Sequence, residues 1–564
     1  MDTRSTFFSL VMLLTVQATG QEWNWSRHIG GEGTDMAYIA GIDVAGSVYI
    51  YGNYAWGPQP TGLEDLIIGD DTLHGSWAGF LAKFDADGDL MWTKNLRSPM
   101  GRLRLGNAIL DTLHQRLLVV GRYNLSCVLD TITLGAPYGG AFVSEWDLEG
   151  HCNWARNVAT NSYNLGEETC DVATVISDHT GRVIVGGITS RYGTDWLEAR
   201  PVPKGSYLAA YTSTGDTLWT RMVALCNAPL SSFNPRSIAC DSEYVYVHSS
   251  VYMNSPNDTI SIDSDNITNI TGGGYALYKA NAENGEIEWS LVDGFPGVGI
   301  DGPQRLAHSS SGGLYIAGGY PPLSEIGGIV LPSTNSYVNG YIVKYTNTGM
   351  LDWVHVYEAT IGTYHNCIVQ TSGDDFLVAG YLQGSIDWDG QEYSTNSRDL
   401  FIGLITASGQ FIEVSSTVQN CTGTSIAARG ASIYMTGKFG SFPPYLPVTI
   451  NGTTFTSRGD ADVVLAKHDM ITGVGSNRSV ESDALIIYAN PNRGSFNMEL
   501  PTCFNHERSL VLRVYDGTGN LVLDRALDAT GSAPGADVFD AAPGLYHVTL
   551  TNGSRTFSGS MVVE

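Results

Sequence analysis

The chain has 564 residues, a formal net charge of −27 and only 15% charged residues, with 66 Gly, 29 Tyr and 12 Trp. The negative charge argues against nucleic acid and anionic membrane surfaces as partners, because both are bound through clustered Lys and Arg. A composition rich in Gly and aromatic residues is typical of β-structure with many tight turns, and the length suffices for two or more domains.

Residues 1–20 are predicted to be a signal peptide. Arg4 precedes an apolar run at 7–16 that is too short to cross a bilayer with ease, and the small residues at 18–20 form a cleavage site. No later stretch approaches the roughly 18 apolar residues of a membrane helix. We therefore expect an exported protein that is soluble or anchored by some other means.

The motif FDADGDLMW at residues 84–92 recurs at a regular interval. Its copies end at the tryptophans Trp92, Trp154, Trp219, Trp289 and Trp353. Successive tryptophans in this series stand 62, 65, 70 and 64 residues apart. Such a period indicates an array of like structural units.

Each unit contains strands of alternating β-branched and aromatic residues. In the first unit these include GSVYIYG at 46–52 and GFLAKFD at 79–85, and both strand series have seven copies. Four antiparallel strands repeated in this way predict an all-β fold, a seven-bladed β-propeller over residues 21–473. The seventh unit lacks a tryptophan strand, whereas Trp25 leads an N-terminal strand that has no unit before it. Pairing of this strand with 462–468 is predicted to close the ring.

The stretch from Trp23 to Tyr54, followed by GSWAGFLAKFDADGDLMW, resembles the bacterial seven-bladed β-propeller repeat called SBBP. The resemblance extends over roughly residues 21–473. It implies an exported or surface protein of a family whose members mostly have no assigned chemistry.

Asp85, Asp87 and Asp89 are spaced like the ligands of a calcium loop. In the other copies, however, the position of Asp87 is occupied by Glu, Thr, Asn, Thr and Ser, while a glycine equivalent to Gly88 is always kept. We therefore favour a tight hairpin turn between the third and fourth strands, with the tryptophan as an anchor in the core. The three aspartates remain weak calcium candidates.

The segment between the second and third strands varies in length and is rich in aromatic residues, as at 53–77. Loops of this kind suit recognition. The alternative interpretation is that IIGDDTL (67–73) and VTINGTTF (448–455) are extra hairpins on their own blades. SIDWDGQEY (385–393) is likewise interpreted as strand, turn and strand in preference to a calcium site.

A polar linker at 474–484 precedes a second region at 485–564. Its alternating strands and its NP, GTG and NG turns predict a small Ig-like β-sandwich. This region resembles the type A C-terminal sorting domain of type IX secretion. The matching residues are Tyr488, Asn490, Pro491, Gly494, Asp516, Gly519, Gly544 and Tyr546.

The resemblance implies export across the outer membrane of a Gram-negative cell. It also implies removal of the domain by a sortase, with the propeller then released or attached to surface lipopolysaccharide. Ala489 stands where the sorting family most often has proline, and Ser558 and Ser560 stand where it commonly has lysine. The alternative is an Ig-like module that sorts nothing.

Motifs for known chemistry are missing from the sequence. It contains no GxSxG, HExxH or CxxC pattern, and no helix-like segment follows the glycines at 28–35. NAENGEIEW (281–289) is similar to the tryptophan-docking repeats of quinoprotein propellers, but the adjacent cysteine pair of some of those enzymes is absent. The local disulfide candidates are Cys152 with Cys170 and Cys226 with Cys240. We expect no cofactor.

Two functions remain open. The favoured one is a non-catalytic binding, adhesion or scaffold module, expected to be monomeric, with an unknown glycan or protein ligand. Its export would depend on the type IX machinery. The alternative is a hydrolase or lyase acting on extracellular polysaccharide at the channel mouth, with paired carboxylates such as those in the acidic turns.

Overall fold

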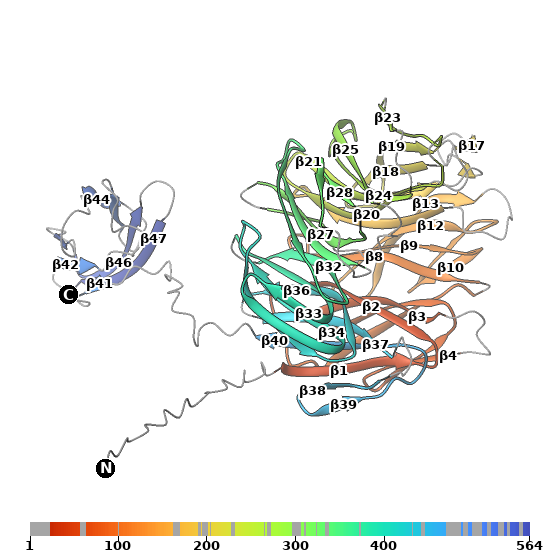
Figure 1. Cartoon of the computed structure of the whole chain (residues 1–564), viewed down its shortest axis with the longest axis horizontal. Coiled ribbons are helices and arrows are strands. Elements are labelled where there is room, and N and C mark those ends of the chain that lie inside the picture. Colours follow the sequence, from red (N-terminus) through yellow and green to blue (C-terminus); the bar gives the residue numbers. More distant parts are fainter. Residues whose placement is uncertain are drawn as a thin grey trace, which may run out of the picture. The chain divides into compact units, whose positions relative to one another are not determined.

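The computed structural model describes two compact units, Met1–Met470 and Ile471–Glu564. The described residues are 23–56, 64–99, 101–161, 170–189, 193–194, 201–202, 205–226, 232–255, 257–263, 265–267, 272–295, 306–309, 312–322, 324–332, 338–371, 374–430, 432–440, 446–469, 487–488, 495–498, 510–515, 521–527, 535–537, 542–551 and 556–563. Over these residues all regular structure is β-strand (Figure 1), and none of it is a helix that could span a membrane.

The first unit is built from antiparallel four-stranded groups, and in the first six the strands follow chain order. The first three are β2 (Thr34–Ile42), β3 (Val48–Trp56), β6 (Ala78–Phe84) and β7 (Leu90–Leu96); β8 (Leu103–Asp111), β9 (Arg116–Tyr123), β12 (Gly140–Trp146) and β13 (Cys152–Asn161); and β14 (Cys170–Ser177), β15 (Val183–Thr189), β18 (Gly205–Tyr211) and β19 (Thr217–Cys226). The alternating residues of the middle strands are buried on both faces, which explains their near-continuous apolar sequence.

The next three groups repeat this order. They are β20 (Ser232–Cys240), β21 (Tyr244–Met253), β24 (Gly272–Asn281) and β25 (Ile287–Phe295); β26 (Leu306–His308), β27 (Leu314–Tyr320), β30 (Asn339–Tyr345) and β31 (Leu351–Tyr357); and β32 (Gly362–Gln370), β33 (Phe376–Trp388), β34 (Gln391–Ile405) and β35 (Phe411–Val418). The first strands of successive groups lie next to one another, and this makes the fold propeller-like.

The last group joins the two ends of the first unit. It contains β36 (Cys421–Arg429), β37 (Ser432–Phe439), β40 (Asp462–Asp469) and, as its outer strand, β1 (Trp23–Gly31). The register pairs Ser26 with Ala466 and Ile29 with Val463. Figure 1 shows red β1 in this group with the blue strands; β40 lies between β1 and β37, and β36 contacts β2 of the first group.

Additional hairpins arise between the second and third strands of several groups. Three of them are hydrogen-bonded to the outer strand of the preceding group, and we call these three the capping hairpins: β4 (Glu64–Ile68) and β5 (Asp71–Gly75) on β1; β16 (Gly193–Thr194) and β17 (Pro201–Val202) on β13; and β22 (Ile260–Ile262) and β23 (Asp265–Ile267) on β19. Ile29 opposes Ile68 in the first pairing, and Ala224 opposes Ile262 in the third.

The expected extra hairpins at 67–73 and 448–455 are present, but the first does not extend its own group. Its strand β4 pairs with β1, so it covers an edge of the neighbouring group. The other short hairpins are β10 (Ser126–Leu129) with β11 (Ile132–Gly135), β28 (Glu325–Ile326) with β29 (Ile329–Val330), and β38 (Val448–Ile450) with β39 (Thr453–Phe455).

The repeated tryptophans lie between groups and are mostly half-buried. Each packs on the glycine in the turn before the outer strand of the next group: Trp25 on Gly88, Trp92 on Gly150, Trp154 on Gly215, Trp219 on Gly285, Trp289 on Gly349 and Trp353 on Gly409. In five of these contacts the indole Nε1 also donates a hydrogen bond to a carbonyl of that turn, at 2.9–3.2 Å. The tryptophan therefore docks one unit onto the next, a role beyond the expected anchoring of its own strand.

The glycines have two reasons to be retained. Their φ angles lie between +75° and +85°, where a side chain is strained. A Cβ at Gly215 would also lie 2.7 Å from the ring of Trp154.

The second unit contains two antiparallel sheets. One has β41 (Ile487–Tyr488), β42 (Ser495–Met498) and β45 (Gly535–Asp537), and the other has β44 (Leu521–Leu527), β43 (Leu510–Tyr515), β46 (Gly544–Thr551) and β47 (Thr556–Val563). Side chains from both sheets, including Phe496 and Val548, form one core.

The predicted sorting residues are only partly described. Tyr488 lies on β41, and Gly544 begins β46. Tyr546 is buried, and its hydroxyl donates to the Ala542 carbonyl at 2.8 Å. Asn490, Pro491, Gly494, Asp516 and Gly519 lie outside the described residues.

Candidate binding groove

The long hairpin of β33 and β34 lines a groove on the first unit. Ser385 pairs with Ser394 and Trp388 with Gln391, which confirms strand, turn and strand at 385–393. Trp388 is fully buried and packs against Tyr393 and other aromatic rings. This packing fixes one wall of a polar groove.

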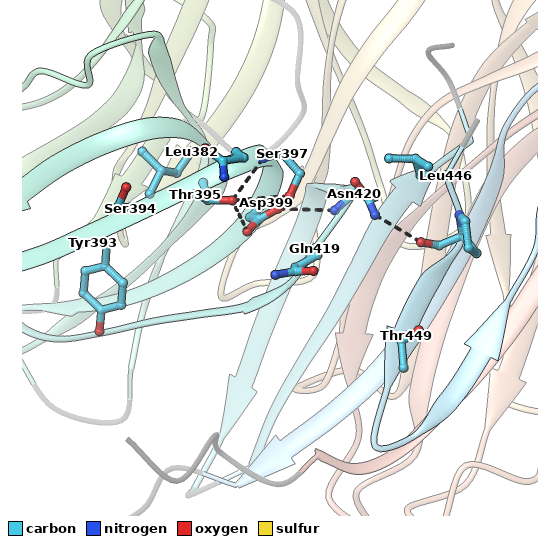
Figure 2. Close-up of a pocket in the computed structure, with 12 residues that line it drawn as sticks. Leu382, Tyr393, Ser394, Thr395, Ser397, Asp399, Gln419, Asn420, Leu446 and Thr449 are labelled. Atoms are coloured by element: carbon cyan, nitrogen blue, oxygen red, sulfur yellow. Dashed lines mark hydrogen bonds between the residues drawn. The ribbon is translucent and has the colours of Figure 1, made fainter. Parts of the chain in front are cut away.

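The groove has a cavity volume of about 850 Å³, which lies within the range of small-ligand sites. Three segments from two neighbouring groups contribute to it: the hairpin, the turn between β35 and β36, and the entry to β38. The lining residues are Leu382, Tyr393, Ser394, Thr395, Asn396, Ser397, Asp399, Gln419, Asn420, Leu446, Pro447 and Thr449 (Figure 2).

Asp399 organises the polar side of the groove. Its side chain is almost fully buried, and both carboxylate oxygens accept hydrogen bonds. Thr395 Oγ1 donates to Oδ2 at 2.6 Å and Ser397 Oγ donates to Oδ1 at 2.5 Å. The backbone N–H of Asn420 donates to Oδ1 at 3.3 Å. The dashed lines in Figure 2 show this carboxylate bridging the two segments.

Asn420 supports the opposite side of the same cluster. Its φ of +60° is in the left-handed region that asparagine tolerates better than most residues. Its Nδ2 donates to the Pro447 carbonyl at 3.2 Å and so ties the β35–β36 turn to the entry of β38. The side-chain carbonyl Oδ1 can accept a hydrogen bond, and the amide nitrogen keeps a second N–H donor.

Tyr393 and Leu446 lie at opposite ends of the groove in Figure 2. The Tyr393 hydroxyl donates to the Val414 carbonyl, and its ring meets the Trp388 ring edge-on at 5.4 Å. Burial, followed by the charge of Glu413, raises the pKa of Tyr393, so the phenol is neutral at physiological pH. Leu446 is 43% exposed. The groove therefore has apolar ends around a polar centre.

The lining carries one acidic side chain and neither Lys nor Arg. A carboxylate already bound by three donors is a positioning group and not a free base. Acid–base cleavage of a glycosidic bond uses two carboxyl groups about 5–9 Å apart, whereas the lining supplies one. The arrangement suits hydrogen bonding to a ligand.

The calcium candidates form a turn. The Asp85 carboxylate accepts the backbone N–H groups of Asp87 and Asp89 at 3.0 and 2.8 Å. Asp89 lies 3.3 Å from Arg27, whose Nε donates to the Gly88 carbonyl at 2.6 Å. Within the described part of the chain, no group of three or more His, Cys, Asp or Glu side chains is arranged to hold a metal ion.

The same turn device occurs elsewhere in the first unit. Asp43, Asp147 and Asp178 each accept the N–H groups two and four residues further along. The acidic turns are therefore capped hairpins, in which the side chain satisfies backbone donors that the turn leaves open.

Another buried carboxyl group was not predicted from the sequence. Asp35 is 1% exposed and accepts the N–H groups of Gly31 at 2.6 Å and Ala55 at 3.0 Å. Burial outweighs these bonds and raises the pKa of Asp35 to about 7. Nearby, His28 pairs with buried Asp462 at 2.6 Å, across the junction of β1 and β40. The His28–Asp462 pair thus links the first and last strands of the first unit.

The local disulfide candidates are not bonded. All seven described cysteines remain thiols, and Cys503 lies outside the described residues. Cys152 and Cys170 are each buried in the apolar core.

The groove residues themselves were not expected. Their one sequence signal is the polar run YSTNSRD at 393–399, which sits in an unusually long second-to-third strand connection. Proximity of this run to Asn420 and Leu446 depends on the packing of two groups, which strand patterns do not encode.

Residues 486–564 match the family described as the secretion system C-terminal sorting domain. This domain directs export by type IX secretion to the cell surface or extracellular space, and it is handled by that machinery. The predicted localisation is confirmed.

Three solved structures are similar to part of this chain. BamB from Moraxella catarrhalis is 12% identical, with 77% of this chain and 99% of that chain covered and a TM-score of 0.33. An apocarotenoid oxygenase from Synechocystis is 9% identical, with 78% and 94% covered and a TM-score of 0.34. Drosophila Semaphorin 2a is 9% identical, with 82% and 97% covered and a TM-score of 0.28. None of these likenesses bears on chemistry. A comparison with curated proteins finds no match.

Proposed function

We propose that this chain is an exported, non-catalytic seven-bladed β-propeller of the SBBP type, closed by its N-terminal strand, that binds a ligand at the groove around Asp399. The strand order of the four-stranded groups, the β1–β40 pairing and the contact of β36 with β2 support the closed ring. The role is that of an adhesion or scaffold module at or outside the cell surface.

The observation that carries the binding role is the Asp399 cluster. A buried carboxylate is costly unless it is fully hydrogen-bonded. Here Thr395, Ser397 and Asn420 supply its donors and become fixed in position at the groove. Such pre-organised polar groups lower the entropy lost on binding.

The C-terminal unit is proposed to be an Ig-like sandwich that a sortase removes after export. Its two sheets around one core support the sandwich, and the sorting-domain match supports the processing. The first unit would then act alone outside the cell.

The test uses the full chain and ligand-observed NMR with a mixed set of neutral, anionic and cationic solutes. A Thr395→Val/Ser397→Ala variant removes the two hydroxyls that Asp399 holds. The control is Thr406→Val/Ser408→Ala, which removes an exposed hydroxyl pair, 2.8 Å apart, from the β34–β35 turn.

We expect at least one solute to bind the wild type and the control with similar affinity, and the groove variant at least tenfold more weakly. Product analysis after long incubation is expected to show no bond cleavage. Binding that the groove variant retains, or turnover of a polysaccharide, would overturn the proposal.

A further inference from the structure

We infer that the groove takes a neutral, hydroxyl-rich saccharide; this rests on the proposed binding function and specifies its ligand class. The inference follows from three properties of the lining: its charge, the direction of its hydrogen bonds and its apolar ends.

The charge of the groove disfavours anions. Asp399 is the one carboxylate in the lining. No Lys or Arg lines the cavity to bind a phosphate, sulfate or uronate. The chain's net charge of −27 adds long-range repulsion. Anionic ligands would leave their charge without a partner.

The groove also disfavours cations. The Asp399 side chain lies 4% exposed beneath the lining hydroxyls, and its two oxygens already accept three hydrogen bonds. A cation in the groove would meet hydroxyl oxygens before it met the carboxylate. Direct ion pairing would require Thr395 or Ser397 to turn away.

The hydrogen bonds leave the polar centre rich in acceptors. The hydroxyls of Thr395 and Ser397 donate to Asp399, and Thr395 Oγ1 also accepts the Ser397 backbone N–H at 3.2 Å. One lone pair on Thr395 Oγ1 and the lone pairs on Ser397 Oγ remain for a ligand. Asn420 donates one Nδ2 proton to the Pro447 carbonyl, and its Oδ1 can accept a further hydrogen bond. Sugar hydroxyls donate to such acceptors, and they also accept from the exposed amides of Asn396 and Gln419.

The apolar ends of the groove also suit a saccharide. Leu446 and Pro447 present apolar surface at one end, and Tyr393 stands at the other. A pyranose ring has a C–H face and a hydroxyl rim, so it can contact both kinds of surface at once. A ligand that is polar throughout would leave Leu446 uncovered.

Calorimetric titration of the full chain with trisaccharides of equal length tests the inference. The neutral probes are trimers of glucose, mannose and galactose; the anionic probe is trigalacturonate, and the cationic probe is a glucosamine trimer. The variants are Thr395→Val/Ser397→Ala and Leu446→Ser, with Thr406→Val/Ser408→Ala as the control.

We expect one neutral trimer to bind at least tenfold more tightly than either charged trimer, and to change little between low and high salt. Affinity should fall at least tenfold in Thr395→Val/Ser397→Ala and severalfold in Leu446→Ser, with the control unchanged. Tighter binding of a charged trimer, lost in the groove variant, would overturn the inference of a neutral ligand and leave the proposed function standing. Absence of binding by all trimers would also overturn the inference, while failure of every solute in the NMR set would remove the proposed function as well.

Discussion

Replacing Gly215 with alanine tests the docking of one unit on the next. Gly215 has a φ of +80°, and an added Cβ would lie 2.7 Å from the Trp154 ring. Gly452 is the matched control, because its φ is +74° but no atom lies within 4 Å of its added Cβ. Both substitutions strain the backbone, and only the first disturbs an indole.

The expected costs differ for that reason. A non-glycine residue in the left-handed region costs about 1–2 kcal/mol, which applies to both variants. At Gly215 the ring must also move, which weakens the 3.0 Å hydrogen bond from Trp154 Nε1 to the Ser213 carbonyl, at a cost of about 1 kcal/mol, and reduces packing. We therefore expect Gly215→Ala to destabilise the protein by about 3 kcal/mol and Gly452→Ala by about 1–2 kcal/mol.

Urea unfolding of the full chain, followed by tryptophan fluorescence, measures the difference as a shift in the midpoint of the major transition. A Trp154→Ala background removes the ring, so Gly215→Ala should there cost no more than the control substitution. Equal costs for Gly215→Ala and Gly452→Ala in the wild-type background would refute the role assigned to the indole.

Three further outcomes are expected. Asp35 has a folded-state pKa of about 7, above its ordinary 3.8, so its contribution to stability is fully present below about pH 4 and is lost as the pH rises through 7. The unfolding free energy of the wild type, measured at a series of pH values, should therefore decline by about 4 kcal/mol over this range. An Asp35→Asn variant should lack this decline. A thiol reagent should modify half-buried Cys226 well before Cys170, whose pKa burial raises to about 12, and mass spectrometry of the native protein would show the order. Deletion of 485–564 should trap the protein in the periplasm, and unchanged surface display in cell fractionation would contradict the sorting role.

The repeat could be predicted from the sequence because the residues that define it lie close together in the chain. The glycine of each turn, the tryptophan after it and the alternation of the middle strands depend on residues within ten positions of one another. The third strand expected at 79–85, for example, is β6 at Ala78–Phe84. The hairpin at 448–455 was recognised for the same reason.

Apart from the pairing of β1 with β40, features that depend on contacts between units could not be predicted. The pattern of β4 shows a strand but not that its partner is β1, and the Asp399 cluster joins residues from separate turns. Asp35 looked like an ordinary polar residue at the start of a strand, because its burial depends on the seam with Ala461, whose carbonyl accepts the Asp35 N–H. In each case the residue or backbone group that completes the contact is distant in the sequence, so a local pattern cannot identify it.

The capping hairpins give the array a direction. Each capping hairpin belongs to one unit but covers the outer strand of the unit before it. If such a unit were duplicated, the hairpin of the second copy would cover the outer strand of the first. Removal of a hairpin would leave its own sheet intact and uncover its neighbour, creating an adhesive edge at a site remote from the altered sequence. Protection of each of these sheet edges therefore depends on a hairpin that the covered sheet does not itself contain.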